Sequence, residues 1–304
     1  NGHVVDIEKL VNELTSIKIF QNPSPYQVEL IPTTPAITAE KLESQKIEGL
    51  IASYTTWFNG NDVERTANVR LSAQALDGKV FAPGEIISFN ETVGRRTGEK
   101  GYQDAIIIVN GEFVPGLGGG ICQTSSTLYN AGLLANLEIV ERTNHGLAVG
   151  YVPLGRDATV AWGSIDLKIK NNTNGYILIR TKVGPNYLTM EIYGQKTPGQ
   201  EVVITNQVNE VIPFETEIIQ DPSLAPGTEI VKQGGQNGYI AYAYRTVKMN
   251  GEVVKTENLG RSYYIPTKRI VVKGPAPVNP PKSETPKTPE KPDPKPDPQP
   301  DPKP

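Results

Sequence analysis

The chain carries a single cysteine, Cys122, so no disulfide bond within it can hold a fold together. Any fold must therefore be stabilised by buried apolar residues. With 304 residues, of which 37% are hydrophobic, the chain is long enough for two or three domains. A lone thiol is ordinary in a cytosolic protein, but in an exported protein it either pairs between chains or reacts. The surroundings of Cys122 are therefore the first place to look for function.

Charge and hydropathy argue against two classes of interaction. The 30 Lys and Arg residues are balanced by 33 Asp and Glu residues, which gives a net charge of −3. Binding to nucleic acid needs clustered positive charge, so we expect no nucleic-acid partner. The longest apolar run, residues 105–109, is far shorter than the ~18 residues of a membrane-spanning helix. Because the first residue is Asn1 rather than Met, we expect a membrane anchor upstream of this sequence.

Sequence patterns divide the chain into four parts. Residues 1–38 contain one helix, which begins after Asp6, and one strand, too little for a domain. Residues 39–200 mix helices and strands, whereas residues 201–274 contain strands only. In residues 275–304, 13 of 30 residues are proline, so we predict a disordered, extended tail. This tail is either a plain spacer or a segment that threads through a meshwork such as a cell wall.

Residues 39–200 contain the patterns of three helices and two groups of strands. Apolar spacing predicts helices over residues 42–54, 63–76 and 122–136, the second of them capped by Asp62. A hairpin over residues 105–114 turns at Asn110-Gly111, and residues 166–193 predict a three-stranded meander. We therefore expect an α+β domain.

Cys122 stands in the segment richest in chemically active side chains. Glycines at 116 and 118–120 precede it, and five polar residues, 123–127, follow it in the predicted helix. The N–H groups at a helix N-terminus favour negative charge and lower the pKa of a thiol. The thiolate suits attack on a carbonyl, and the glycines let backbone N–H groups approach an oxyanion. The plainer alternative is a small buried hydrophobic side chain. A phosphate-binding loop is excluded, because Ile121 and Cys122 stand where Lys and Ser or Thr are required.

His145 is the predicted base for Cys122, because the other histidine lies in the short N-terminal part. A solvent-facing or merely hydrogen-bonded histidine is the alternative. Asp157 either orients the imidazole of His145, which would complete a three-residue arrangement, or caps a turn.

Two arginines near these residues have open roles. Arg142 and Arg156 either bind a substrate carboxylate through their guanidinium forks or are surface charges. One cysteine and one usable histidine fall short of a zinc ligand set, so we predict neither a metal nor a cofactor.

Several motifs resemble those of the VanW family, from about residue 39 to residue 193. These motifs are Pro83-Gly84-Glu85-Ile86-Ile87-Ser88-Phe89-Asn90, Val93-Gly94, Gly101-Tyr102, Gly118-Gly119-Gly120-Ile121-Cys122-Gln123, Thr127-Leu128-Tyr129-Asn130-Ala131, Glu141-Arg142, His145 and Gly155-Arg156-Asp157-Ala158-Thr159-Val160. The family often has Ser after the histidine, where this chain has Gly146.

Two further parts of the chain resemble known modules. The strand-only region is similar to a G-five domain, a wall-associated module named for its glycines. The glycines that match its turns are Gly227, Gly234, Gly235, Gly238, Gly251 and Gly274. Residues 1–38 resemble the C-terminal remnant of a peptidoglycan-binding domain that often precedes VanW.

The resemblance implies an α+β catalytic VanW domain at residues 39–200, an elongated all-β G-five domain at residues 201–274 and a disordered Pro-rich tail at residues 275–304. It also implies an extracellular protein of a Gram-positive-type envelope, in the cell wall or at the outer face of the membrane. Members with this cysteine motif are similar to L,D-transpeptidases in chemistry. Such an enzyme attacks a stem peptide at its third residue, releases the terminal D-Ala and holds the donor as a thioester on Cys122.

From these patterns we predict the site residues and partners. Cys122, His145 and Asp157 are the predicted catalytic residues. The predicted substrate and oxyanion contacts are Gly119, Gly120, Gln123, Arg142 and Arg156. The predicted partners are peptidoglycan stem peptides and glycan, and we expect a monomer.

Two rival functions remain open at this point. In one, the protein binds the wall without catalysis, and its turns only shape a glycan or peptide groove. In the other, it is a thiol peptidase that hydrolyses stem peptides through the same acyl-enzyme.

Overall fold

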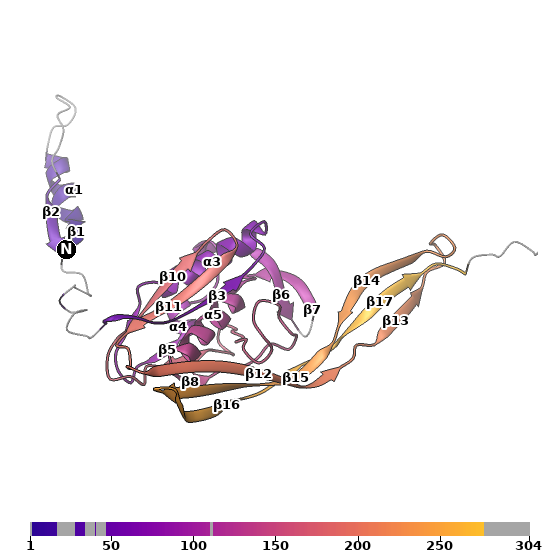
Figure 1. The fold of residues 1–304 in the computed structure, drawn as a ribbon. Coiled ribbons are helices and arrows are strands. Elements are labelled where there is room, and N and C mark those ends of the chain that lie inside the picture. Colours follow the sequence, from indigo (N-terminus) through magenta and orange to yellow (C-terminus); the bar gives the residue numbers. More distant parts are fainter. Residues whose placement is uncertain (1, 17–27, 34–39, 41–46, 110–111, 277–304) are drawn as a thin grey trace, which may run out of the picture. The chain divides into compact units, whose positions relative to one another are not determined.

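The computed structural model describes residues 2–16, 28–33, 40, 47–109 and 112–276. Contacts divide the chain into two compact units (Figure 1). The larger unit comprises Asn1–Glu215 and Gly235–Lys268, and the smaller one comprises Thr216–Gly234 and the chain from Arg269 onward. The predicted Pro-rich tail lies almost wholly outside the described residues, which end at residue 276.

The N-terminal part contains two strands and one helix. Strand β1 (Gly2–Val5) pairs antiparallel with β2 (Leu30–Thr33). Helix α1 (Ile7–Ser16) follows Asp6, whose Oδ1 accepts the N–H of Lys9 at 2.9 Å. The predicted helix and its cap are therefore confirmed, and the peptidoglycan-binding remnant stays a prediction.

The core of the larger unit is built on an antiparallel sheet with the strand order β3-β11-β10-β4. Its strands are β3 (Gly49–Trp57), β11 (Tyr187–Gly194), β10 (Ile177–Val183) and β4 (Val80–Phe81). Three strands occupy the predicted residues 166–193, but they do not form the predicted meander. Strands β10 and β11 pair with each other, whereas β9 (Lys168–Lys170) belongs to a different sheet, because its partners are distant in sequence.

The helix predicted over residues 42–54 is wrong from residue 49 onward. Strand β3 occupies these residues and pairs with β11 along its whole length, and Thr55 hydrogen-bonds to Thr189 across the two strands at 2.7 Å. A few apolar residues at loose spacing fit a helical stripe, but pairing with a partner distant in sequence overrides local preference. Residues 41–46 lie outside the described part of the chain.

Two helices pack onto this sheet. Helix α3 (Val63–Leu76) begins after Asp62, which accepts the N–H of Arg65 at 3.0 Å, so the predicted cap is confirmed. Helix α5 (Ile121–Leu134) contacts β3 and β11, and it also contacts β8 and β12, so that it lies between two sheets (Figure 1). The largest core side chains include Leu76, Leu128, Leu133, Ile169 and Ile177.

Smaller elements frame the start of α5. Strands β5 (Ile86–Ser88), β9 (Lys168–Lys170) and β8 (Glu138–Glu141) form a small sheet, and α4 (Phe89–Val93) and a 3-10 turn (Gly98–Lys100) follow β5. Strands β6 (Asp104–Val109) and β7 (Glu112–Leu117) form the predicted hairpin. The predicted turn residues, 110–111, lie outside the described residues.

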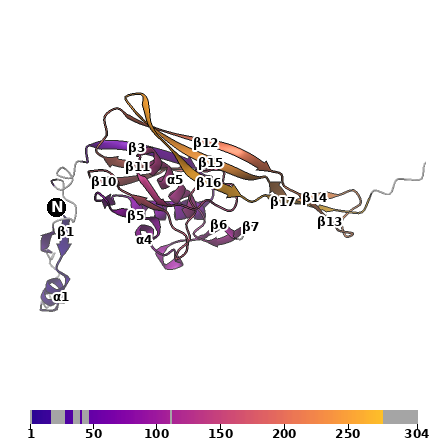
Figure 2. The same cartoon turned by 90° about the horizontal axis from the view of Figure 1, so that it is seen from below.

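The strand-only region is all β, as predicted, but it divides between the two units. Strands β12 (Gln200–Ile212), β15 (Gly238–Met249) and β16 (Glu252–Tyr264) lie side by side in an antiparallel sheet of the larger unit (Figure 2). Strands β13 (Thr216–Gln220), β17 (Thr267–Lys273) and β14 (Glu229–Gln236) form a separate sheet, in which β13 and β17 run parallel.

This division differs from the expectation of one separate domain over residues 201–274. The reason is packing. Ile204 of β12 and Leu259 of β16 pack against the hydrophobic core that α5 shares with the first sheet, and Tyr264 at the end of β16 is 1% exposed. The sheet β12-β15-β16 therefore belongs energetically to the body that carries Cys122.

Within the described residues, no helix is both long enough and apolar enough to cross a membrane.

Candidate active site

Cys122 is the second residue of α5, and two glycines shape the turn in front of it. Gly120 is the N-cap residue with φ 108°, a left-handed conformation that favours glycine. A Cβ on Gly119 would lie 2.6 Å from the carbonyl oxygen of Ile106, so no larger residue fits there. Because glycine offers no side-chain cap, no side chain satisfies the N–H groups of the first turn. The N–H of Ile121 donates to the carbonyl of Gly118 at 3.2 Å and that of Gln123 to the carbonyl of Gly120 at 3.0 Å, so among these three first-turn residues the N–H of Cys122 is the one left for a negatively charged group.

The thiol of Cys122 is partly buried and interacts with two groups across α5. Its Sγ lies 3.5 Å from the carbonyl oxygen of Val160, and the thiol also interacts with the imidazole of His145. Burial on its own raises the pKa of the thiol. The hydrogen bond to His145, its positive charge and the charge of Arg96 outweigh burial, so the pKa of Cys122 is lowered. The site therefore favours a thiolate.

His145 is held between the thiol and a buried carboxylate. Its Nδ1 lies 2.6 Å from Oδ2 of Asp157, which leaves Nε2 to face Cys122. The backbone N–H of His145 also donates to the same oxygen, at 2.6 Å. Burial lowers the pKa of His145, but the hydrogen bonds to Asp157 and Cys122 reverse this effect and raise its pKa to about 9. The arrangement therefore stabilises a thiolate–imidazolium pair.

Asp157 is 1% exposed and depends on several donors. Burial raises the pKa of this carboxyl, but the hydrogen bond and charge of His145 and the charge of Arg142 lower it below its usual value. Arg142 donates to Oδ1 of Asp157 at 3.1 Å and to its backbone carbonyl at 2.6 Å. The hydroxyl of Tyr264 donates to the same Oδ1 at 2.5 Å and accepts the N–H of Gly155 at 2.7 Å.

The strand β16 therefore reaches the site directly. Besides Tyr264, its Ser262 accepts a hydrogen bond from Arg142 at 2.8 Å. The backbone N–H of Ile265, just after β16, donates to the carbonyl of Gly146 at 2.7 Å, and Asn144 donates to the carbonyl of Tyr263 at 2.7 Å. The segment that contains His145 is thus fixed at three places to β16 or to the residue just after it.

The polar run after Cys122 has a structural role. Ser125 donates to the carbonyl of Ala158 at 2.6 Å, and Ser126 accepts the N–H of Ala158 at 2.9 Å. Thr124 bonds to Ser72 at 2.8 Å. These hydroxyls connect the start of α5 to α3 and to the segment that carries Asp157. They therefore fix the position of Cys122 relative to Asp157.

Cys122 and His145 open onto a cavity of about 780 Å³. Its walls come from the hairpin β6–β7, the glycine turn and the segments around residues 148–151 and 159–165. The ring of Tyr151 stands edge-on to His145, with centroids 6.4 Å apart at 84°. Its phenol is protonated at neutral pH, because burial and the charge of Cys122 raise its pKa well above the usual value.

The structure brings Cys122, His145 and Asp157 together, and it places Gly119 and Gly120 on the cavity wall as the sequence suggested. The amide of Gln123 is also at the wall, but it is already bonded to Thr56 and Trp57, both at 3.0 Å, and to Arg65 at 2.9 Å.

Both predicted arginines point elsewhere. Arg142 lies behind Asp157 with its side chain 7% exposed. Arg156 donates to Asn130 at 2.7 Å, and its guanidinium stacks over Tyr54 at 5.1 Å. Neither lines the cavity, so neither is positioned for a substrate carboxylate.

Sequence reasoning missed two residues. Arg96 lines the cavity and acts on the charge of Cys122, although it is 26 positions earlier in the sequence. Tyr264 is 107 positions after Asp157 and is the last residue of β16. No local pattern announces either residue.

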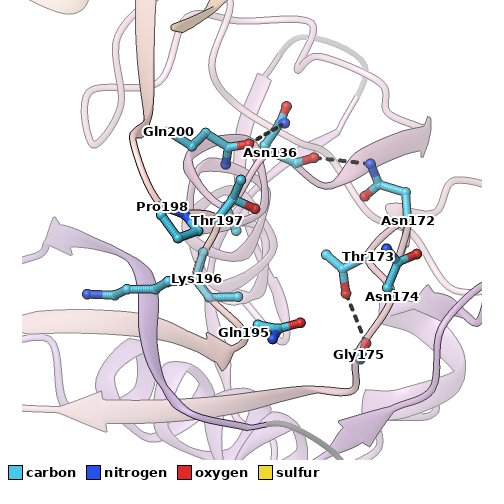
Figure 3. A pocket seen from close by; sticks show the side chains of 12 residues that line it. Asn136, Asn172, Thr173, Asn174, Gly175, Gln195, Lys196, Thr197, Pro198 and Gln200 are labelled. Carbon is cyan, nitrogen blue, oxygen red and sulfur yellow. Dashed lines mark hydrogen bonds between the residues drawn. The ribbon is translucent and has the colours of Figure 1, made fainter. Parts of the chain in front are cut away.

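A second cavity lies away from this site and is lined by amides and hydroxyls (Figure 3). It measures about 390 Å³. Asn136 donates to Gln200 at 3.3 Å, and Thr173 donates to the carbonyl of Gly175 at 2.9 Å, so part of its polar lining is already paired. It contains neither the cysteine nor a histidine or carboxylate, so nucleophilic chemistry is assigned to the Cys122 cavity.

Across the described ranges, no group of three His, Cys, Asp or Glu side chains is placed to hold a metal ion.

Comparison with known proteins identifies two domains. The family model "VanW like protein" matches residues 64–193, and the model "G5 domain" matches residues 203–276. The chain therefore contains a VanW domain followed by a G5 domain. This combination indicates a cell-wall-associated protein of the cell surface.

Two curated relatives match the VanW part. YoaR of Bacillus subtilis (strain 168) is 48% identical over 162 residues, which cover 53% of this chain and 53% of YoaR. The vancomycin B-type resistance protein VanW of Enterococcus faecalis (strain ATCC 700802 / V583) is 31% identical over 144 residues, 46% of this chain and 52% of that protein. The chain thus spans about half the length of the curated relatives it matches.

Two solved G5 domains match the strand-only region of the chain. The IgA1 protease G5 domain shares 35% identity over 25% of this chain and 93% of its own, with a TM-score of 0.19. The G5 domain of HP0197 shares 31% identity over 24% of this chain and 99% of its own, with a TM-score of 0.15. The G5 assignment rests on the family model, which matches residues 203–276.

Proposed function

We propose that the protein is a cysteine L,D-transpeptidase that cross-links peptidoglycan stem peptides through a thioester on Cys122. The observation that carries the proposal is the chain of contacts from the thiol through His145 to the buried Asp157. This arrangement lowers the pKa of a nucleophile, supplies a proton donor beside it and opens onto a cavity large enough for a peptide.

In the first half-reaction the thiolate of Cys122 attacks the carbonyl carbon of the third stem residue. A C–S bond forms, and the carbonyl electrons move onto oxygen. The imidazolium of His145 then donates its Nε2 proton to the nitrogen of the terminal D-Ala as the C–N bond breaks. The products are a thioester on Cys122, free D-Ala and a neutral His145.

In the second half-reaction the side-chain amine of a neighbouring stem attacks the thioester. The neutral His145 accepts a proton from this amine as the new C–N bond forms, and the C–S bond breaks to regenerate the thiolate. Asp157 stays ionised throughout and stabilises the imidazolium by its 2.6 Å contact. Each cycle therefore returns the enzyme to the same ion pair.

Backbone N–H groups at the start of α5 are the proposed oxyanion donors. The glycines in front of Cys122 bring the backbone close to the thiol, and the turn has no side-chain cap to compete for these groups. The N–H of Gln123 is excluded, because it donates to the carbonyl of Gly120 at 3.0 Å. The N–H groups of Gly118 and Ile121 are also bonded, to the carbonyls of Gln103 and Gly118, so the proposed donors are the N–H groups of Cys122, Gly119 and Gly120.

The G5 domain supports an extracellular place of action. G5 domains are associated with binding to cell-wall glycans or peptidoglycan, so this part would hold the enzyme on its polymeric substrate. We propose that it does so outside the cytoplasmic membrane, in the cell wall or at its inner border.

A cross-linking assay tests the proposal. The protein is incubated with disaccharide tetrapeptide, and in parallel with the same compound acetylated on its side-chain amine. We expect a cross-linked dimer and repeated release of D-Ala from the first substrate only, because the acetylated compound can form the thioester but offers no amine to displace it, so it should release at most about one D-Ala per enzyme molecule. Cys122→Ser should give no product. Release of D-Ala with tripeptide monomer from both substrates would instead identify a hydrolase. No product from either substrate would contradict both enzymatic functions and favour a binding protein.

A further inference from the structure

Two buried polar side-chain atoms in the described residues have no hydrogen-bond partner, and both belong to the Cys122 cavity. They are Nη2 of Arg96 and Oγ1 of Thr159. A buried polar group without a partner is costly, and the cost is larger for a charged one. Because every other buried polar side-chain atom of the described residues is paired, their coincidence in one cavity points to a ligand that supplies acceptors there.

Arg96 is held so that Nη2 stays in place. Its Nη1 donates to Oδ1 of Asn90 at 2.7 Å, and its guanidinium stacks on Phe89, 5.5 Å from the ring centroid. The partner of Nη1 is a neutral amide, and no ion pair among the described residues includes Arg96. The positive charge is therefore fixed in orientation. The charge of Asp166 acts on it, but among the described residues no carboxylate lies within ion-pair distance of Arg96.

Thr159 is also fixed near the sulfur. Its backbone N–H donates to the carbonyl of Thr143 at 2.8 Å. The next residue, Val160, supplies the carbonyl that lies 3.5 Å from Sγ of Cys122. A ligand atom bound by the hydroxyl of Thr159 would thus lie close to the reacting thiol.

The charge of the cavity indicates the sign of the ligand. The charged side chains on its wall, apart from the thiol and imidazole themselves, are Arg65, Arg95 and Arg96, and no Asp or Glu lines it. The remaining wall includes apolar side chains such as Leu117 and Trp162. The cavity therefore favours an anionic ligand with an apolar body.

We propose that Arg96 and Thr159 bind the terminal carboxylate of the acyl donor, one residue beyond the carbonyl that Cys122 attacks. Arg96 is near enough to affect the charge of Cys122, and adjacent residues of a peptide are 3.8 Å apart between Cα atoms. A carboxylate on the leaving residue would therefore reach Nη2 while the preceding carbonyl reaches the sulfur. This assignment rests on the proposed function and adds the substrate feature that the site selects.

The test compares two small acyl donors that differ only in this group. Nα,Nε-diacetyl-L-lysyl-D-alanine has a free carboxylate, and its C-terminal amide does not. Acylation of Cys122 is followed by mass spectrometry of the intact protein, at a pH at which the thiol is fully ionised. We expect the wild-type protein to react at least about tenfold faster with the acid than with the amide, as a hydrogen bond to a charged group predicts.

Variants assign that preference to residues. Arg96→Gln should abolish it, and Thr159→Val should reduce it by roughly two- to tenfold, the value of a neutral hydrogen bond. Arg70→Gln removes an exposed arginine of α3 outside the cavity and should keep the full preference. Alkylation of Cys122 by neutral iodoacetamide should persist in all three variants, which shows that the thiol remains intact and accessible.

Binding to Cys122→Ser separates this inference from the proposed function. If neither donor acylates the wild-type protein but Cys122→Ser binds the acid better than the amide, the transpeptidase function fails and the carboxylate site stands. Equal rates for acid and amide in the wild-type protein would overturn the site while leaving the function intact. Retention of the preference in Arg96→Gln, or no binding of either donor to Cys122→Ser, would also overturn it.

Discussion

Replacing Tyr264 with Phe should weaken the candidate active site, whose Asp157 lies more than a hundred positions earlier in the sequence. Tyr264 is 1% exposed, and its hydroxyl donates to Asp157 at 2.5 Å and accepts the N–H of Gly155 at 2.7 Å. Burial and the charge of Asp157 raise the pKa of Tyr264, so the phenol stays protonated and remains a donor. Tyr264→Phe keeps the ring and removes only this bridge.

The size of the effect follows from the two lost bonds. A hydrogen bond to a charged group contributes about 1.5–3 kcal/mol, and an unsatisfied buried N–H costs about 1–3 kcal/mol. Because both terms share one hydroxyl and the structure can relax, we expect the free energy of unfolding to fall by about 2–4 kcal/mol. We also expect slower acylation of Cys122, by roughly tenfold, because Asp157 must hold the imidazole in orientation.

Urea unfolding and the acylation rate measure the two effects. The matched control is Tyr263→Phe, because Tyr263 is the neighbouring tyrosine and is 42% exposed. That change should alter stability by less than about 0.5 kcal/mol and leave acylation unchanged. If Tyr264→Phe behaves like the control in both measurements, Tyr264 of β16 does not support Asp157, and the predicted losses of stability and acylation rate are refuted.

Four further outcomes are expected. Alkylation of Cys122 by iodoacetamide should show an apparent pKa below the usual value for cysteine. The variant His145→Ala should acylate Cys122 more slowly, by on the order of a hundredfold or more. An unchanged acylation rate would exclude His145 as the partner of Cys122. The pKa of His145 rises from 6.5 to about 9 on folding, so its stabilising contribution is present below pH 6.5 and is lost as pH rises through 9. Urea unfolding should therefore show a larger deficit for His145→Gln at pH 6 than at pH 10, and an equal deficit would refute the shift. Arg142→Met should lower the free energy of unfolding by about 1.5–3 kcal/mol, because Asp157 loses a charged hydrogen-bond donor and keeps His145 as its remaining buried charge partner, and a loss below about 0.5 kcal/mol would contradict this.

Local sequence signals were enough for the elements whose ends are set by nearby residues. Asp6 and Asp62 each cap the helix that follows, as predicted, because a cap needs only the next three residues. The turns around glycine and asparagine likewise located most strands of the G5 region. The position of Cys122 at the start of α5 followed from the same local logic.

Elements that depend on distant partners were not predictable. The sequence predicts a helix where β3 lies, because its apolar residues fit both the helical and the strand periodicity. Only the pairing with β11 decides between the two structures. The burial of the polar run after Cys122 depends on partners such as Thr56 and Ser72, which precede it by more than fifty residues. Polar composition alone cannot reveal such a network.

The candidate site shows the same limit. The approach of His145 and Asp157 to Cys122 was anticipated, since few other candidates exist in the chain. The direction of Arg142 was not, because it depends on Asp157 and on Ser262 from β16. Side-chain orientation is set by packing that the spacing of motifs does not encode.

The mass of the acyl-enzyme tests the central claim most directly. The wild-type protein is mixed with disaccharide tetrapeptide, quenched in acid and measured intact, with Cys122→Ser as the control. The account predicts a single adduct equal to the donor minus D-Ala, located on Cys122, removable by hydroxylamine and absent from the control. An adduct on another residue, an adduct that keeps D-Ala, or no adduct while product still forms would contradict a thioester on Cys122.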